Sequence, residues 1–251
     1  MVNKEDLAKA MGEENLRRPM ALKLPAISLN GSKGTFVRRN PAEKKGDKWE
    51  KKEIGQTFNG VIVRVRLSLS EYNPNYRRET NEYDNIKEKA MLWETNAGVR
   101  SKIAEGTPEE LRKAYPNLRA RRILYLVVND ELVKLTVKGS GLGKLFKYFQ
   151  EFGSNQHLFE FYTEFHPSKE ENKAGMGYWA LQPLRGAKLT DAELESIAGH
   201  ITNVSENLKR FKEFYGDKPE AIEKELDLSV ADEEAPSPVE EEELSEEDLP
   251  V

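Results

Sequence analysis

The 251-residue sequence contains no cysteine. This absence excludes disulfide bonds, zinc sites with cysteine ligands and a thiol nucleophile, and it fits a reducing compartment. No apolar run approaches the roughly 20 residues that cross a membrane. Residues 1–6 lack the apolar region of a signal peptide. These absences predict a cytoplasmic protein without a membrane partner.

Signatures of catalysis and of cofactor binding are also scarce. The three histidines, His157, His166 and His200, do not form a His-Glu-x-x-His pattern. The segment Gly139–Lys144 differs from a phosphate-binding loop, because three residues instead of four separate its outer glycines and Leu145 follows the lysine. We therefore expect no cofactor, no bound metal and no enzymatic activity. A metal-dependent nuclease built from distant Asp and Glu residues is the alternative.

Charge is abundant and unevenly distributed. The chain has 39 basic and 44 acidic residues, but ten of the acidic residues lie in residues 231–251, where no basic residue occurs. This segment is predicted to be disordered, because it cannot bury enough apolar surface to offset chain entropy. The rest of the chain has a charge of +5, and residues 17–125 contain 24 basic and 13 acidic residues. A basic body with an acidic tail predicts a polyanion-binding surface. The tail either competes for that surface and recruits partners, or only increases solubility.

The clearest strand covers residues 57–70. Five apolar residues alternate from Val61 to Leu69 and are expected to face one core, with Arg64 and Arg66 on the other face. Two arginines two residues apart on a strand lie about 7 Å apart, which suits the phosphate spacing of an extended nucleic-acid strand. A solvated strand face is the alternative.

The next segment, residues 71–82, is predicted to be a long loop that carries tyrosines and arginines in turn. Its Tyr72 and Tyr76 would stack on bases, while Arg77 and Arg78 hold phosphates. Trp49 lies in a lysine-rich loop over residues 40–52 and is either a core anchor or a stacking platform. Trp93, in a strand over residues 90–97, is expected in the core.

Downstream, residues 123–138 are predicted to form a hairpin with Lys134 and Lys138 on its outer face. Thr107 and Glu110 predict a capping box that begins a short helix. Ser140 is expected to cap a helix over 142–152. A capping box at Thr190 begins a helix that extends to about residue 215. Its apolar stripe would pack on the sheet or, in a homo-oligomer, on another copy of the chain. The stripe comprises Leu194, Ile197, Ala198, Ile201, Val204, Leu208, Phe211 and Phe214 or Tyr215.

Further strands are predicted over 34–39, 157–166 and 177–184. Several short strands with a helix between them and another after them indicate a mainly β chain with α-helices (α+β). This pattern suggests a small barrel of the oligonucleotide-binding (OB-fold) type. The predicted parts are an N-terminal arm (1–25), an OB-fold-like nucleic-acid-binding domain (26–186), a C-terminal helical segment (187–229) and a disordered acidic tail (230–251).

The last six residues are an acidic run with a short apolar tip: Glu246, Glu247, Asp248, Leu249, Pro250 and Val251. With this tip and a basic, strand-rich body, the chain resembles the single-stranded DNA-binding proteins of bacteria and phages. The resemblance implies an OB-fold body, the cytoplasm of a bacterial or phage-infected cell, and a tail that docks on replication and recombination proteins. That family usually ends in Phe, where this chain has Val251.

The function expected from these patterns is non-catalytic, largely sequence-independent binding and protection of single-stranded DNA during replication, recombination and repair. A replication or recombination accessory protein, or a virion protein, that acts through protein contacts is the alternative. The candidate nucleic-acid-binding residues are Arg38, Arg39, Trp49, Arg64, Arg66, Tyr72, Tyr76, Arg77, Arg78, Arg119, Arg121, Arg122, Lys134 and Lys138.

Overall fold

The computed structural model of the chain describes residues 24–41, 49–152, 156–172 and 174–215, and for 207–215 it describes the backbone alone. The predicted N-terminal arm, apart from residues 24 and 25, and the predicted acidic tail lie outside the described residues. None of the described helices has the length and apolar character needed to cross a membrane.

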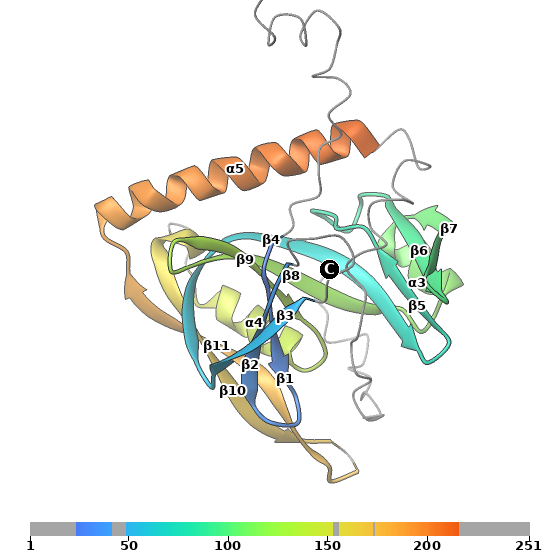
Figure 1. The fold of residues 1–251 in the computed structure, drawn as a ribbon, viewed down its shortest axis with the longest axis horizontal. Coiled ribbons are helices and arrows are strands. Elements are labelled where there is room, and N and C mark those ends of the chain that lie inside the picture. Colours follow the sequence, from blue (N-terminus) through green and yellow to red (C-terminus); the bar gives the residue numbers. More distant parts are fainter. Residues whose placement is uncertain (1–23, 42–48, 153–155, 173, 216–251) are drawn as a thin grey trace, which may run out of the picture.

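The described chain is mainly β with a few helices, as the sequence predicts (Figure 1). Its strands are β1 (Ala26–Asn30), β2 (Thr35–Asn40), β3 (Glu50–Gly55), β4 (Phe58–Asn73), β5 (Tyr76–Thr80), β6 (Ala90–Asn96), β7 (Val99–Gly106), β8 (Arg119–Val128), β9 (Glu131–Val137), β10 (Phe161–Glu171) and β11 (Gly177–Lys188). Its α-helices are α3 (Pro108–Ala114), α4 (Gly141–Gln150) and α5 (Asp191–Tyr215), and a short 3-10 turn, η1, covers Leu158–Glu160.

The strands form one open, mixed sheet in the order β3-β2-β1-β9-β8-β4-β5-β6-β7. The β1–β9 pair is parallel, and the other pairs are antiparallel. The long strand β4 also pairs at its beginning with β10, which pairs with β11. The pairings of the described strands do not close a barrel, so the predicted barrel closure is not found.

A β-bulge divides β4 into two parts. The pairing with β8 moves from Ile62 opposite Leu126 to Arg64 opposite Tyr125, so Val63 is the extra residue. Val61 and the bulged Val63 pack with residues beneath α5, whereas Val65 beyond the bulge packs in the core on the opposite side. The prediction that the alternating apolar residues of this strand share one core is therefore wrong.

The central core fills the space between the sheet and α4. Phe36, Phe58 and Phe165 are in ring contact there, with centroids 4.8 Å apart in each of two pairs. Leu145 and Tyr148 of α4 are buried against it. The predicted cap of α4 is wrong, since Ser140 has helical backbone angles and makes no side-chain capping hydrogen bond.

Helix α5 crosses the other side of the sheet, over β9, β8 and β4 (Figure 1). Thr190 and Glu193 form the predicted capping box, in which the Thr190 N–H donates to Glu193 Oε2 at 2.8 Å. Four residues of the predicted stripe pack on the sheet: Leu194, Ile197, Ile201 and Val204. Ala198 is exposed, contrary to the prediction. The side chains of 208–215 lie outside the described residues.

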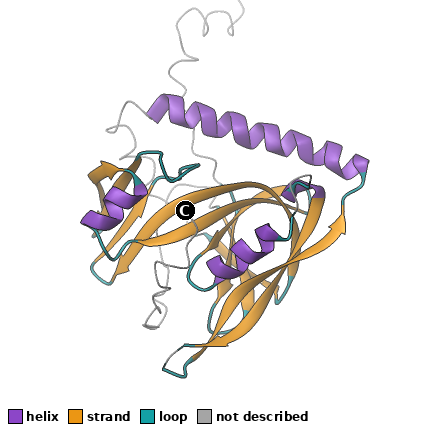
Figure 2. Cartoon of the chain, turned by 180° about the vertical axis from the view of Figure 1, so that it is seen from behind, coloured by secondary structure: helices purple, strands orange, loops and turns teal. Residues whose placement is uncertain are grey.

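Strands β5, β6 and β7 extend the sheet beyond the central core and are covered by α3 (Figure 2). We call these strands the extension. The Thr107–Glu110 capping box of α3 is present as predicted. Strand β7 is not expected from the sequence. It returns from β6 through Ala97 and Gly98, whose φ angles of 48° and 81° make a tight turn.

The predicted loop over 40–52 is partly a strand. Residues 50–55 form β3, an edge strand that pairs only with β2 among the described strands. The charged residues of β3 leave no apolar alternation by which the strand could be recognised in the sequence. Charged side chains are nevertheless typical of exposed edge strands. Residues 42–48 lie outside the described part of the chain.

Candidate nucleic-acid interface

A face rich in basic residues lies on the α5 side of the sheet. Strand register places Arg64, Tyr125 and Lys134 in one row across β4, β8 and β9. Residues in register in a sheet project to the same side. Arg66, Arg119 and Arg121 follow on the same side, because side chains alternate along each strand.

This side continues across the extension. Register places Arg77 of β5 in a row with Tyr72 of β4 and Arg100 of β7. Lys102 lies two residues beyond Arg100 on the same strand. We name the eight cations the arginine face: Arg64, Arg66, Arg77, Arg100, Lys102, Arg119, Arg121 and Lys134.

Arg100 and Lys102 are absent from the sequence prediction. The available signal was their i, i+2 spacing after the Ala97-Gly98 turn, which would have been informative had β7 been recognised. Arg39 extends the face in the other direction, since Ala26 of β1 pairs with both Arg39 and Lys134.

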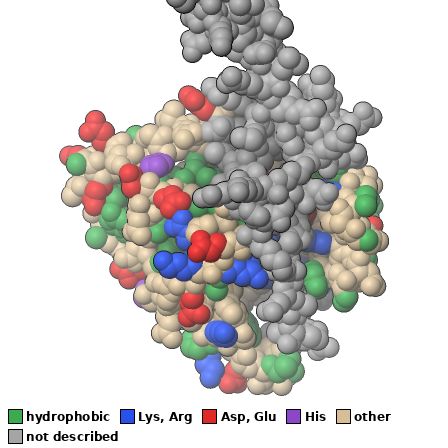
Figure 3. All heavy atoms as spheres, viewed as in Figure 1, with side chains coloured by type: hydrophobic (Ala, Val, Ile, Leu, Met, Phe, Trp, Pro, Cys, Tyr) green, Lys and Arg blue, Asp and Glu red, His purple; other side chains and the backbone are tan. Residues whose placement is uncertain are grey.

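Several cations of this face pair with carboxylates. Glu82 and Asp84, from the connection between β5 and β6, reach Arg64, Arg66 and Lys134. Among the described strand residues that register places on the same side from β4 to β9, the acidic ones are Glu79 and Glu105. Among these strand residues and the two carboxylates of the β5–β6 connection, the cations therefore outnumber the carboxylates eight to four. In a space-filling view, Lys and Arg side chains near the middle of the visible face lie among Asp and Glu side chains (Figure 3).

Glu82 is the centre of a partly buried network. Its carboxylate accepts hydrogen bonds from Tyr125 Oη at 2.6 Å and from Lys134 Nζ at 2.9 Å, and the Arg66 guanidinium lies 3.9 Å away. Burial acts to raise the pKa of Glu82, but the positive charge of Lys134, the hydrogen bonds and Arg66 outweigh it and lower that pKa. Burial acts to lower the pKa of Lys134, but Glu82 raises it.

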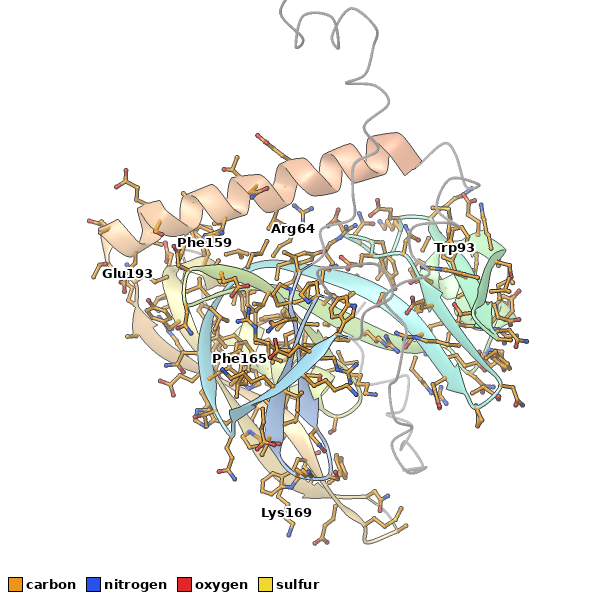
Figure 4. The ribbon with its side chains drawn as sticks, viewed as in Figure 1. Arg64, Trp93, Phe159, Phe165, Lys169 and Glu193 are labelled. Atoms are coloured by element: carbon orange, nitrogen blue, oxygen red, sulfur yellow. The ribbon has the colours of Figure 1, made fainter. Side chains whose placement is uncertain are left out.

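These pairs change the interpretation of three predicted phosphate contacts. Arg66 is 8% exposed, and its guanidinium also donates to the Glu82 backbone carbonyl at 2.8 Å. Arg64 lies beneath α5 (Figure 4) and contacts Ser205 Oγ at 3.4 Å. In this structure Arg64, Arg66 and Lys134 therefore hold carboxylates and the underside of a helix.

Elsewhere on this side, guanidinium N–H groups are buried without an acceptor. The Nε atoms of Arg39, Arg77 and Arg100 are inaccessible and have no hydrogen-bond partner in the described structure. Arg39 and Arg77 are among the predicted residues, whereas Arg100 is not.

The structure overturns the prediction of a long loop over 71–82. Residues 73–76 turn tightly between β4 and β5, so neighbouring residues point to opposite sides. Tyr76 and Arg78 therefore face away from the arginine face. The Tyr76 hydroxyl donates to Glu71 Oε1 at 2.9 Å, and Arg78 lies over the Tyr76 ring and pairs with Glu94. The hydrogen bond to Glu71, followed by burial, raises the pKa of Tyr76.

Tyr72 lies on the arginine face and is 51% exposed. The other predicted contacts are more scattered. Arg122 projects to the α3 side, where burial lowers its pKa. Arg38 is ion-paired with Glu131, and Lys138 is exposed just beyond β9. Trp49, partly buried, precedes β3, and residues 246–251 lie outside the described chain.

Within the described residues, no group of three or more His, Asp or Glu side chains is placed to hold a metal ion. Comparison with protein-family models, curated proteins and solved structures finds no match to this chain.

Proposed function

We propose that the protein binds single-stranded DNA without catalysis and with little sequence preference. The observation that supports this function best is the arginine face, on which cations outnumber carboxylates and an exposed tyrosine lies in register with Arg77. Basic grooves follow a nucleic-acid backbone, and aromatic rings stack on bases of any sequence. Such a protein would protect single strands during replication, recombination and repair.

We further propose that the body is a variant of the OB-fold. The order β4, β8, β9, α4, β10 and β11 supports this proposal, because a helix lies between the third and fourth of these strands and β10 returns to pair with β4. In OB-folds, oligonucleotides bind on a face that includes the second and third strands. Here β8 and β9 take those places, and both contribute to the arginine face.

The acidic tip, Glu246 to Val251, belongs to this proposal as a docking segment for replication and recombination proteins. Its support is the sequence alone: acidic residues next to a short apolar end. The accessory-protein and nuclease alternatives have no specific observation in their favour.

The test is the binding of a labelled poly-dT oligomer at two salt concentrations. We expect measurable affinity at low salt that falls as salt rises, with a log–log slope of about 0.7 per phosphate contact. Duplex DNA of the same length serves as the competitor. No binding by the folded protein, or equal affinity for the duplex, would contradict the proposal.

Tyr72 provides a test at one side chain. Tyr72→Ala should weaken poly-dT binding by about 1–3 kcal/mol if the ring stacks on a base. Tyr76→Ala is the matched control, because Tyr76 lies on the opposite side of the same hairpin. Equal losses in the two variants would show that Tyr72 does not act as a platform.

A further inference from the structure

Arg77 and Arg100 flank one carboxylate on the extension. Arg77 Nη2 lies 2.9 Å from Glu79 Oε2, and Arg100 Nη2 lies 3.8 Å from Glu79 Oε1. Two guanidinium groups thus share one negative charge, which leaves one positive charge unbalanced within the cluster. Both arginines come from regular strands, so their backbones are held by the sheet.

The cluster is also more buried than a surface ion pair. The Arg100 side chain is 9% exposed, and its guanidinium lies 5.1 Å from the ring centroid of Trp93, which is 2% exposed. The Nε donors of Arg77 and Arg100 are buried and lack acceptors in the described structure. The two oxygens of one carboxylate do not satisfy all the N–H donors of two guanidinium groups.

We propose that Arg77 and Arg100 form a binding site for one backbone phosphate of single-stranded DNA. The inference rests on the proposed function and assigns the extension a part in it. A phosphodiester group offers oxygens that match the planar forks of the guanidinium groups. Tyr72, in register with Arg77 on the next strand, would stack on the neighbouring base.

Glu79 has two effects in this site. It orients both guanidinium groups, and its negative charge opposes the entry of a phosphate. Substitutions in the cluster should therefore change DNA affinity in opposite directions. Removing a guanidinium weakens binding, whereas neutralising Glu79 strengthens it. A cluster with only a structural role would give no such opposition.

The experiment measures poly-dT affinity at low and high salt for Arg100→Gln and Glu79→Gln. Arg100→Gln should lose affinity about tenfold at low salt, as expected for one charged hydrogen-bonding contact, and should reduce the log–log slope by about 0.7. Glu79→Gln should bind more tightly than wild type. The matched controls are Arg78→Gln and Glu94→Gln, which remove the same charges from the opposite side of β5 and β6 and should leave affinity near the wild-type value.

A second readout separates this site from the proposed function. Inorganic phosphate should shift the NMR signal of the Trp93 indole N–H in wild type but not in Arg100→Gln. If wild type binds poly-dT but the cluster variants behave like their controls, the phosphate site is wrong and the function stands. If wild type does not bind poly-dT, the function is wrong. The site then stands only if phosphate still shifts the Trp93 signal.

Discussion

At the scale of single residues, Glu82 controls how the centre of the arginine face is arranged. It lies on the connection between β5 and β6, yet it bonds to side chains of β8 and β9 and lies close to Arg66 of β4. A buried ion pair adds little when complete, but removing one partner leaves an uncompensated charge. Glu82 thus ties the extension to the central strands.

Glu82→Gln should lower the free energy of unfolding by about 1–3 kcal/mol at neutral pH, because Lys134 and Tyr125 lose a charged hydrogen-bond partner. The folded-state pKa of Glu82 is lowered, so its contribution is complete above the unfolded pKa of about 4.3–4.5. That contribution is lost as the pH falls through the lower folded pKa. Urea unfolding of both proteins from pH 7 to pH 3 should show the two stabilities converging below about pH 4.5. A constant difference across this range would contradict the assignment.

Residue types alone predicted several contributors to the arginine face but not their orientation. Arg64 and Arg66 are on one side as the alternation required, and Arg119 and Arg121 share it. The sequence predicts that Arg77 and Arg78 hold phosphates together, but the tight hairpin directs them to opposite sides of the sheet. That orientation depends on whether 71–82 is a loop or a hairpin, which composition cannot decide.

At the scale of elements, α5 is held to the sheet by a few side chains. Ile197 and Val204 are 6% and 1% exposed, and Ser196 and His200 contact Asp130 in the β8–β9 turn, each at 3.2 Å. The Asp130 contacts lie toward the beginning of the helix, and Arg64 contacts Ser205 farther along it.

Ile197→Ala should weaken the docking of α5 by about 2 kcal/mol, because it removes a buried side chain and leaves a cavity. Hydrogen exchange should then accelerate in the α5 amides over 191–206, ahead of those in β8 and β9. Glu195→Ala, on the exposed side of the same helix, is the control. Unchanged α5 exchange in Ile197→Ala would show that this contact does not hold the helix.

Elements with strong local signals were predictable. The capping boxes at Thr107 and Thr190 and the hairpin within residues 123–138 are present as predicted. Strands β3 and β7 were not predictable, because an exposed, charged strand lacks the alternation of apolar and polar residues that burial imposes. The branch at β4, which pairs with β8, β5 and β10, is a long-range property that no local pattern encodes.

At the scale of the whole molecule, charge is divided between the body and residues 231–251. Deleting those residues removes ten negative charges and leaves 39 basic and 34 acidic residues. A tethered polyanion competes for a basic surface at an effective concentration on the order of millimolar. The deletion should therefore tighten poly-dT binding, most strongly at low salt, because salt screens the competition.

The control for this deletion removes only residues 249–251 and keeps all ten charges. Its affinity for poly-dT should match wild type, while its binding to a replication partner should fall. If the full deletion binds poly-dT no more tightly at low salt, the segment does not compete for the surface.

The bulge in β4 has a consequence for which changes in length the gene can accept. Val63 is the extra residue, so losing its codon would straighten the strand and leave Val61, Ile62, Arg64 and Val65 facing as they do now. Loss of a codon farther along, between Arg64 and Ser70, would instead turn every later side chain of the strand to the other side. Serines, and Arg66 where the loss precedes it, would then enter the core, and leucines would replace them on the surface. Within this part of β4, viable deletions should therefore be confined to position 63.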